Sequence, residues 1–254
     1  MTAERMEKIQ KRIKENKVKI LIFLFPIISY LLFLILMKNN EELFMQIIKE
    51  DSILEYIQFF LYIFSGIFTI KIVKRLIELK ESKFKIIAFS ILAILFFFIA
   101  FEEISWGQRI LNIETPESVA SNNIQGELTV HNLAPLQLKM HFAYIAIGIY
   151  GISSRFLLKK IFPKQYLKFR IFTPDYFLFF YFLFAIVFWF LISYFPSPLS
   201  FMAGEVMPLW KWQELFETYV AMAFLFFVVY AYREDLRSKG AIFTLQAVKR
   251  IAVS

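Results

Sequence analysis

Six runs of about twenty mainly apolar residues divide the chain, and each has the length needed to cross a hydrocarbon core of about 30 Å. They cover residues 18–37, 52–72, 84–104, 138–158, 174–195 and 214–232. Backbone polar groups find no partners in lipid, so runs of this kind are stable there as helices. A hydrophobic content of 59% is also too high for an ordinary soluble domain of 254 residues. The sequence therefore predicts one all-α, polytopic membrane domain over residues 1–254, a bundle of about six transmembrane helices.

Lys and Arg are unevenly distributed among the intervals between these runs. Of the 29 basic residues, 24 lie near the N-terminus, in residues 71–85 and 155–170, or after the sixth run. By the positive-inside rule, both termini are expected in the cytoplasm, residues 1–17 as a basic segment and 233–254 as a tail. Residues 105–136 then form a long outer loop. The net charge is +8, and the basic residues are distributed as expected for a membrane protein of this topology. We therefore expect the lipid bilayer as a partner and no nucleic acid.

Three shorter segments carry helix signals. Thr115-Pro116-Glu117 and Thr173-Pro174-Asp175 each combine a hydroxyl cap, a proline at the first helical position and an acid in the first turn. The first signal predicts a short helix within the outer loop, ending before Gly126, and the second predicts the start of the fifth span. Residues 41–50 have the pattern of an amphipathic helix resting against the outer headgroups.

Polar and ionisable residues gather at the ends of the spans that the topology places outside. These residues are Glu55 and Gln58, Glu102 and Glu103, His141, Glu214 and Glu217, with His131 in the outer loop. Because they fall at one membrane depth, they predict an outward-facing polar pocket. The candidate catalytic residues are Glu102, Glu103, His131 and His141. The candidate substrate-binding residues are Trp106, Gln108, Arg109, Glu55, Gln58, Glu214 and Glu217.

Helical spacing adds two expectations. Glu102, Trp106 and Arg109 share a face if the third span stays helical past Ile104. A polar stripe on the second span comprises Glu55, Gln58, Tyr62, Ser65 and Thr69. Such a stripe should face protein or water, because ionised acids near the bilayer centre cost about 2.5–3.5 kcal/mol on insertion scales.

A metal site is one interpretation of the polar residues at the outer ends of the spans. Catalytic zinc takes three protein ligands and leaves one position for water. His131, His141 and one of Glu102 or Glu103 can supply such a set, with another Glu as base for the bound water. The chain has no cysteine and no HExxH motif, so no compact ligand motif supports the reading. In the structural alternative, these acids are helix-end charges that pair with Arg109 or Lys139.

The strings EEISWGQR, TPE, N-x-QGE and HN occur in order between the third and fourth spans, over about thirty residues. In this pattern the chain resembles a set of uncharacterised bacterial multi-pass membrane proteins. The resemblance implies a bacterial membrane protein, and it brings no known activity with it. With both termini in the cytoplasm, we expect the protein in the inner membrane.

Three functions remain open from the sequence. The pocket can belong to a hydrolase or transferase acting on a lipid-linked or small polar substrate. It can belong to a cation- or proton-linked transporter or channel component, or the outer loop can dock a partner onto a scaffold. No GxxxxGK[ST], GxGxxG or GxSxG motif occurs, which argues against nucleotide hydrolysis, dinucleotide binding and a serine hydrolase. Few polar residues follow Thr69 toward the cytoplasm, so the sequence favours a pocket over a conduit.

Overall fold

The computed structural model describes residues 3–49, 52–121, 123, 126–130, 133–194 and 209–251, and this part is helical apart from an isolated antiparallel bridge between Asn123 and Leu133. The elements are α1 (Ala3–Asn39), α2 (Glu41–Ile48), α3 (Ile53–Glu78), α4 (Lys83–Glu103), η1 (Ser105–Gly107), α5 (Gln108–Leu111), α6 (Glu117–Ala120), α7 (Ala134–Ile161), α8 (Tyr166–Phe169), η2 (Arg170–Phe172), η3 (Tyr176–Leu178), α9 (Phe179–Tyr194), η4 (Leu209–Trp212) and α10 (Gln213–Ile251). Six segments of the described chain are long and apolar enough to cross a membrane. The multi-pass helical architecture is thus confirmed.

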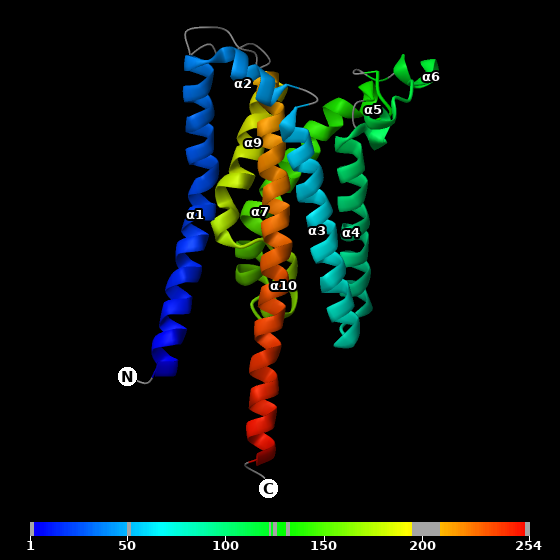
Figure 1. Cartoon of the computed structure of the whole chain (residues 1–254). Coiled ribbons are helices and arrows are strands. Elements are labelled where there is room, and N and C mark those ends of the chain that lie inside the picture. Colours follow the sequence, from blue (N-terminus) through cyan, green and yellow to red (C-terminus); the bar gives the residue numbers. More distant parts are fainter. Residues whose placement is uncertain are drawn as a thin grey trace.

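The long helices match the six predicted spans, and two of them extend much further. α1 includes most of the basic N-terminal segment, and α10 continues through most of the basic tail. Both extensions are rich in Lys and Arg, which are good helix formers in water. The start of α1 and the end of α10 lie at one end of the molecule, whereas α5 and α6 lie at the other (Figure 1).

α10 lies at the centre of the bundle (orange in Figure 1) and is packed against both α3 and α9. α3 in turn packs along α4, and α7 packs along α9, so two helical pairs flank the central helix. The side chains of Val220, Ala221, Ala223 and Val228 are fully buried on α10. A helix that is apolar around its circumference is expected in such an interior position. α10 therefore joins the two pairs.

Glycines set the closest helix contacts. A Cβ added to Gly151 of α7 would lie 2.2 Å from Cγ of Phe182 on α9, and one added to Gly148 would lie 2.8 Å from the Phe182 carbonyl oxygen. Small residues let helix backbones approach closely in membrane proteins, where tight packing replaces the hydrophobic effect as a source of association. The α7–α9 pair therefore depends on these two glycines.

The fifth span begins slightly later than predicted. The Thr173 hydroxyl does not cap the helix, because it donates to the Arg170 carbonyl oxygen at 2.9 Å. The cap is Asp175, whose carboxylate accepts from the Tyr176 backbone N–H at 2.8 Å at the start of η3. The same carboxylate pairs with Lys19 at 3.1 Å and Arg155 at 3.3 Å. Asp175 thus connects α1, α7 and the start of the fifth span.

The predicted amphipathic helix at residues 41–50 is α2, which Asn40 caps by accepting from the Leu43 N–H at 3.0 Å. Its apolar face packs on the bundle: Phe44 is fully buried, and its ring centroid lies 4.8 Å from that of Trp212. α2 therefore covers one end of the bundle beside η4 and the start of α10.

Candidate functional site

The chain leaves the helical conformation directly after α4. Ser105 and Trp106 have φ angles of 48° and 56°, and Gly107 follows at 75°. Left-handed backbone costs non-glycine residues about 1–2 kcal/mol each, so two in succession require support from their surroundings. The prediction that one helical face carries Glu102, Trp106 and Arg109 is therefore wrong. The Arg109 side chain lies outside the described part of the chain.

Glu102 supplies part of this support. Its Oε1 accepts from Trp106 Nε1 at 2.6 Å, and its Oε2 accepts from the Val130 backbone N–H at 2.7 Å. The residue is buried, with 4% of its surface exposed. One carboxylate thus holds both the turn after α4 and a distant part of the loop. Because both oxygens have loop donors, this geometry favours a positioning role for Glu102 over the predicted catalytic or metal-binding roles.

Gln108 and neighbouring polar residues join the two halves of the loop. The Gln108 side chain donates to Thr115 Oγ1 and accepts from the Leu128 N–H at 2.8 Å. Asn123 Nδ2 donates to the Thr129 carbonyl oxygen at 2.8 Å. Gln108 was predicted to bind substrate, but both its amide nitrogen and its amide oxygen form hydrogen bonds within the loop.

Replacing Glu102 by Ala is expected to loosen this loop. The substitution removes two charge-assisted acceptors, and a donor left without its partner in a buried setting costs about 1–3 kcal/mol. Limited proteolysis of purified protein should cleave residues 105–130 faster in Glu102→Ala than in the parent. Glu114→Ala, at an exposed position in the same loop, is the control and should behave like the parent. Equal cleavage rates in Glu102→Ala and the parent would contradict the anchoring role.

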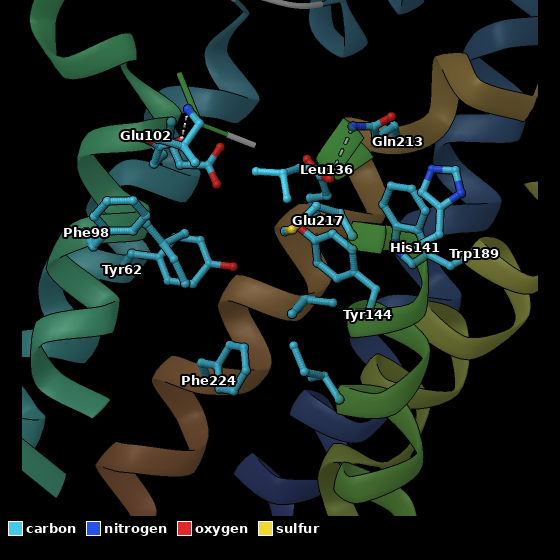
Figure 2. A pocket seen from close by; sticks show the side chains of 16 residues that line it. Tyr62, Phe98, Glu102, Leu136, His141, Tyr144, Trp189, Gln213, Glu217 and Phe224 are labelled. Carbon is cyan, nitrogen blue, oxygen red and sulfur yellow. Dashed lines mark hydrogen bonds between the residues drawn. The ribbon is translucent and has the colours of Figure 1, made fainter. Parts of the chain in front are cut away.

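A cavity of about 190 Å³ lies between the two helical pairs. Its lining comes from five helices and the loop: Tyr62 of α3; Phe98, Ile99, Glu102 and Glu103 of α4; Val130 of the loop; Leu136, Met140, His141, Tyr144 and Ile147 of α7; Trp189 of α9; and Gln213, Glu217, Val220 and Phe224 of α10. Figure 2 shows side chains from these helices pointing toward a shared space. Helices distant in sequence thus build one cavity at the end of the bundle that carries the loop.

The cavity brings together four of the predicted site residues: Glu102, Glu103, His141 and Glu217. Gln58 and Glu214 are buried and form a pair, in which Gln58 Nε2 donates to Glu214 Oε2 at 3.0 Å and to the Glu214 backbone oxygen at 3.1 Å. Trp106 is 46% exposed and does not line the cavity. His131 lies outside the described residues.

Carboxyl groups concentrate around Glu103. Its carboxyl interacts electrostatically with those of Glu217, Glu214, Glu55 and Glu102. Within the described chain, no group donates a hydrogen bond to Glu103 or forms a salt bridge with it. Glu217 differs, because its Oε1 accepts from Gln213 Nε2 at 3.2 Å and the carboxylate also interacts with the Tyr144 hydroxyl. Glu55 thus belongs to the same electrostatic cluster without lining the cavity.

The predicted polar stripe on α3 faces protein, as expected. Gln58, Ser65 and Thr69 are fully buried, and Tyr62 is 2% exposed. The Ser65 and Thr69 hydroxyls each donate to the backbone oxygen four residues earlier, at 2.7 Å. The Tyr62 hydroxyl points into the cavity (Figure 2), and no hydrogen bond joins it to another described residue. It is therefore positioned to meet a bound molecule.

Aromatic residues form the wall opposite Tyr62. The Trp189 ring stacks on Tyr144, with centroids 4.6 Å apart, and lies 4.7 Å from the His141 ring. His141 Nδ1 lies 3.2 Å from Ser193 Oγ. Tyr144, Trp189 and Gln213 are not among the site residues predicted from the sequence. Among 12 tyrosines and 33 phenylalanines, aromatic identity carries no positional signal, although Tyr144 follows His141 by three residues and so lies near it on α7.

The zinc hypothesis finds no support in the described residues, where no three His, Asp or Glu side chains are grouped to hold a metal ion. His141 and Glu102 both line the cavity, but the third proposed ligand, His131, lies outside the described residues. The complete ligand set therefore stays a sequence-based hypothesis.

Comparisons of the chain with protein-family models, curated proteins and solved structures find no match.

Proposed function

We propose that the protein is a membrane enzyme, a hydrolase or transferase, that acts on a lipid-linked or polar-headed substrate with Glu103 and Glu217 as its acid–base pair. The observation that carries this proposal is that two carboxyls from different helices line one cavity beside the Tyr62 hydroxyl. Ionisable residues inside a membrane bundle are costly, and they commonly mark functional sites. The resemblance in the loop motif supports a bacterial inner-membrane protein without assigning it a reaction.

The chemistry follows from the types of residue that line the cavity. Paired carboxyls in one site act as general acid and general base in many hydrolytic and transfer reactions. Glu103 has no competing hydrogen-bond donor among the described groups, so a substrate proton or a water can occupy that place. Glu217 is oriented by Gln213 and Tyr144. In this proposal Glu103 exchanges the proton with the reacting group, and Glu217 serves as its partner across the cavity.

A cation or proton conduit is the less favoured function. The cavity lining becomes apolar away from the loop, ending at Ile147, Val220 and Phe224. Ser65 and Thr69, which lie further along α3, use their hydroxyls for hydrogen bonds to their own helix. The described residues therefore provide no polar path from the cavity toward the other end of the bundle.

The enzyme proposal can be tested by comparing lipid extracts. We expect mass spectrometry to find at least one lipid or lipid-linked species whose abundance changes when the parent protein is produced, and no such change with the double variant Glu103→Gln plus Glu217→Gln. Gln preserves the shape of Glu and removes its capacity to exchange a proton. Equal amounts of both proteins in the membrane are the required control. Identical extracts from parent and variant cells would overturn the proposal.

We further propose that both termini are cytoplasmic and that residues 105–136 lie in the periplasm. The charge distribution supports this orientation, because the basic flanks concentrate at the end of the bundle that carries the start of α1 and the end of α10. A reporter that is active only in the periplasm should be active when it is inserted after Ser121 and silent when it is inserted after Lys80. The reversed pattern would invert the orientation and place the cavity on the cytoplasmic side.

A further inference from the structure

The cavity is amphipathic along the bundle axis, and α4 and α10 show the same gradient. On α4, Glu103 and Glu102 come first, and Ile99 follows one turn deeper. On α10, Gln213 and Glu217 precede Val220 and Phe224. α7 adds His141 and Tyr144, which stand among the apolar side chains of Leu136, Met140 and Ile147. A molecule that fills the cavity therefore meets carboxyls with one end and apolar side chains with the other, the polarity pattern of a lipid.

Between α4 and α7, the cavity is not closed by packing of these two helices on each other within the described part of the chain. α4 and α7 both contribute lining residues, yet they have no extended contact with each other. Tyr62 of α3 and the residues of α10 line another side of the cavity. Neither α1 nor α2 contributes a lining residue. If α4 and α7 cross the membrane, the space between them faces the bilayer. Lipid can therefore reach the cavity sideways.

The volume limits how much of a molecule is enclosed. A cavity of about 190 Å³ has room for about six water molecules at about 30 Å³ each. This is below the roughly 300–1,000 Å³ of pockets that bury a whole drug-sized ligand. A lipid headgroup and the first part of one chain can enter, and the rest of the chain must remain between α4 and α7 or in the bilayer.

The lining also selects the charge of the headgroup. None of the 16 residues that line the cavity is Lys or Arg, whereas three are glutamates. Phe98, Tyr62, Tyr144 and Phe224 add aromatic rings, and ring faces attract ammonium groups. The Tyr62 hydroxyl is oriented into the same space without a hydrogen-bond partner among the described groups. A phosphate headgroup would meet carboxyls and find no cationic side chain in this lining.

We propose that the cavity takes the ammonium-bearing headgroup of a membrane amphiphile, which enters from the bilayer between α4 and α7 with its chain directed toward Ile99, Ile147 and Phe224. The inference rests on the proposed function in taking this cavity as the reaction site, and it narrows the substrate to aminolipids. It predicts that binding requires both the positive charge and the alkyl chain.

Binding can be measured without turnover, as a ligand-dependent shift of the unfolding temperature of purified protein. Dodecylamine is the probe. Dodecanol is its neutral counterpart, dodecyl phosphate is its anionic counterpart, and propylamine carries the same headgroup on a short chain. We expect dodecylamine to bind saturably and at least ten-fold more tightly than each of the other three. Equal binding of dodecyl phosphate would overturn the cationic headgroup. Equal binding of propylamine would overturn entry of an amphiphile from the bilayer.

Matched variants locate the binding. Glu217→Gln should weaken dodecylamine binding at least ten-fold, whereas Glu78→Gln, an exposed carboxyl at the far end of α3, should leave it unchanged. Ile99→Trp fills the apolar part of the cavity and should also weaken binding, while Ile94→Trp, 68% exposed on the same helix, should not. Should Glu217→Gln fail to fold, Ile99→Trp still decides the question. Parent-like binding in the folded cavity variants would place the probe elsewhere and overturn the inference.

The two proposals fail in different ways. If lipid conversion depends on Glu103 and Glu217 but dodecylamine shows no preference, the aminolipid inference is wrong and the enzyme proposal stands. If dodecylamine binds as expected and lipid extracts never differ, the cavity binds aminolipids without converting them.

Discussion

Replacing Glu103 by Gln is expected to lower turnover of the folded protein by about 10²–10⁴-fold, the usual contribution of a positioned general acid or base. Glu103 lines the cavity, and it has no hydrogen bond or salt bridge to another described residue that would give it a structural role. Gln occupies almost the same volume and cannot exchange the proton. The assay is the rate at which membranes convert the lipid identified from the extracts, normalised to the amount of protein.

The adjacent carboxyl provides a matched comparison. Glu102→Gln makes the same chemical change one residue earlier, at a side chain that holds Trp106 and Val130. It should lower thermal stability more than Glu103→Gln and lower turnover less. Equal turnover in Glu103→Gln and the parent would contradict the acid–base assignment. A greater loss of turnover in Glu102→Gln would move the chemistry to the residue that we assign to positioning.

The second large effect is expected at Gly151, where substitution by Ala should destabilise the bundle by about 1–3 kcal/mol or more. Helix propensity alone predicts the opposite, because Ala is favoured over Gly by about 1 kcal/mol. The new Cβ would lie 2.2–2.4 Å from Cγ, Cδ1 and Cδ2 of Phe182. These atoms are close to the Phe182 backbone and cannot swing away as the tip of a flexible side chain can. The midpoint of thermal unfolding in detergent provides the measurement.

Two further variants test the stated cause. Ala146→Leu adds more atoms than Gly151→Ala on the same helix, but at an exposed position, and should leave the midpoint nearly unchanged. Replacing the opposing ring, in Gly151→Ala plus Phe182→Ala, removes the three atoms that the new Cβ would meet, so the two substitutions should be less than additive. Full additivity would show that the two residues do not clash.

The sequence predicted the number of helices long enough to cross a membrane well, because length and hydropathy are properties that add along the chain. Length and hydropathy define spans, and the membrane then places their ends at common depths. The cavity consequently contains Glu103 and Glu217, which lie more than a hundred residues apart in the chain. Periodicity also predicted the buried side of α3, because polar residues at helical spacing share one face.

The details of the loop and cavity could not be predicted in the same way. The break at Ser105 and Trp106 uses left-handed backbone at two residues that rarely adopt it, and only Gly107 gave a local signal. Glu102 and Glu103 look equivalent in sequence, but α4 ends at Glu103, and the returning loop provides donors to Glu102. Glu214 and Glu217 differ in their hydrogen bonds, because the Gln58 side chain donates to Glu214 and not to Glu217. These differences arise from contacts between distant segments.

The central position of α10 has a consequence for how the protein is made. Ribosomes synthesise α10 after the other five spans, so the α3–α4 and α7–α9 pairs exist before the helix that joins them. Until α10 inserts, Glu103 and Tyr62 lack the part of the cavity wall that carries Glu217. The cavity is therefore completed only when α10 inserts between the two pairs.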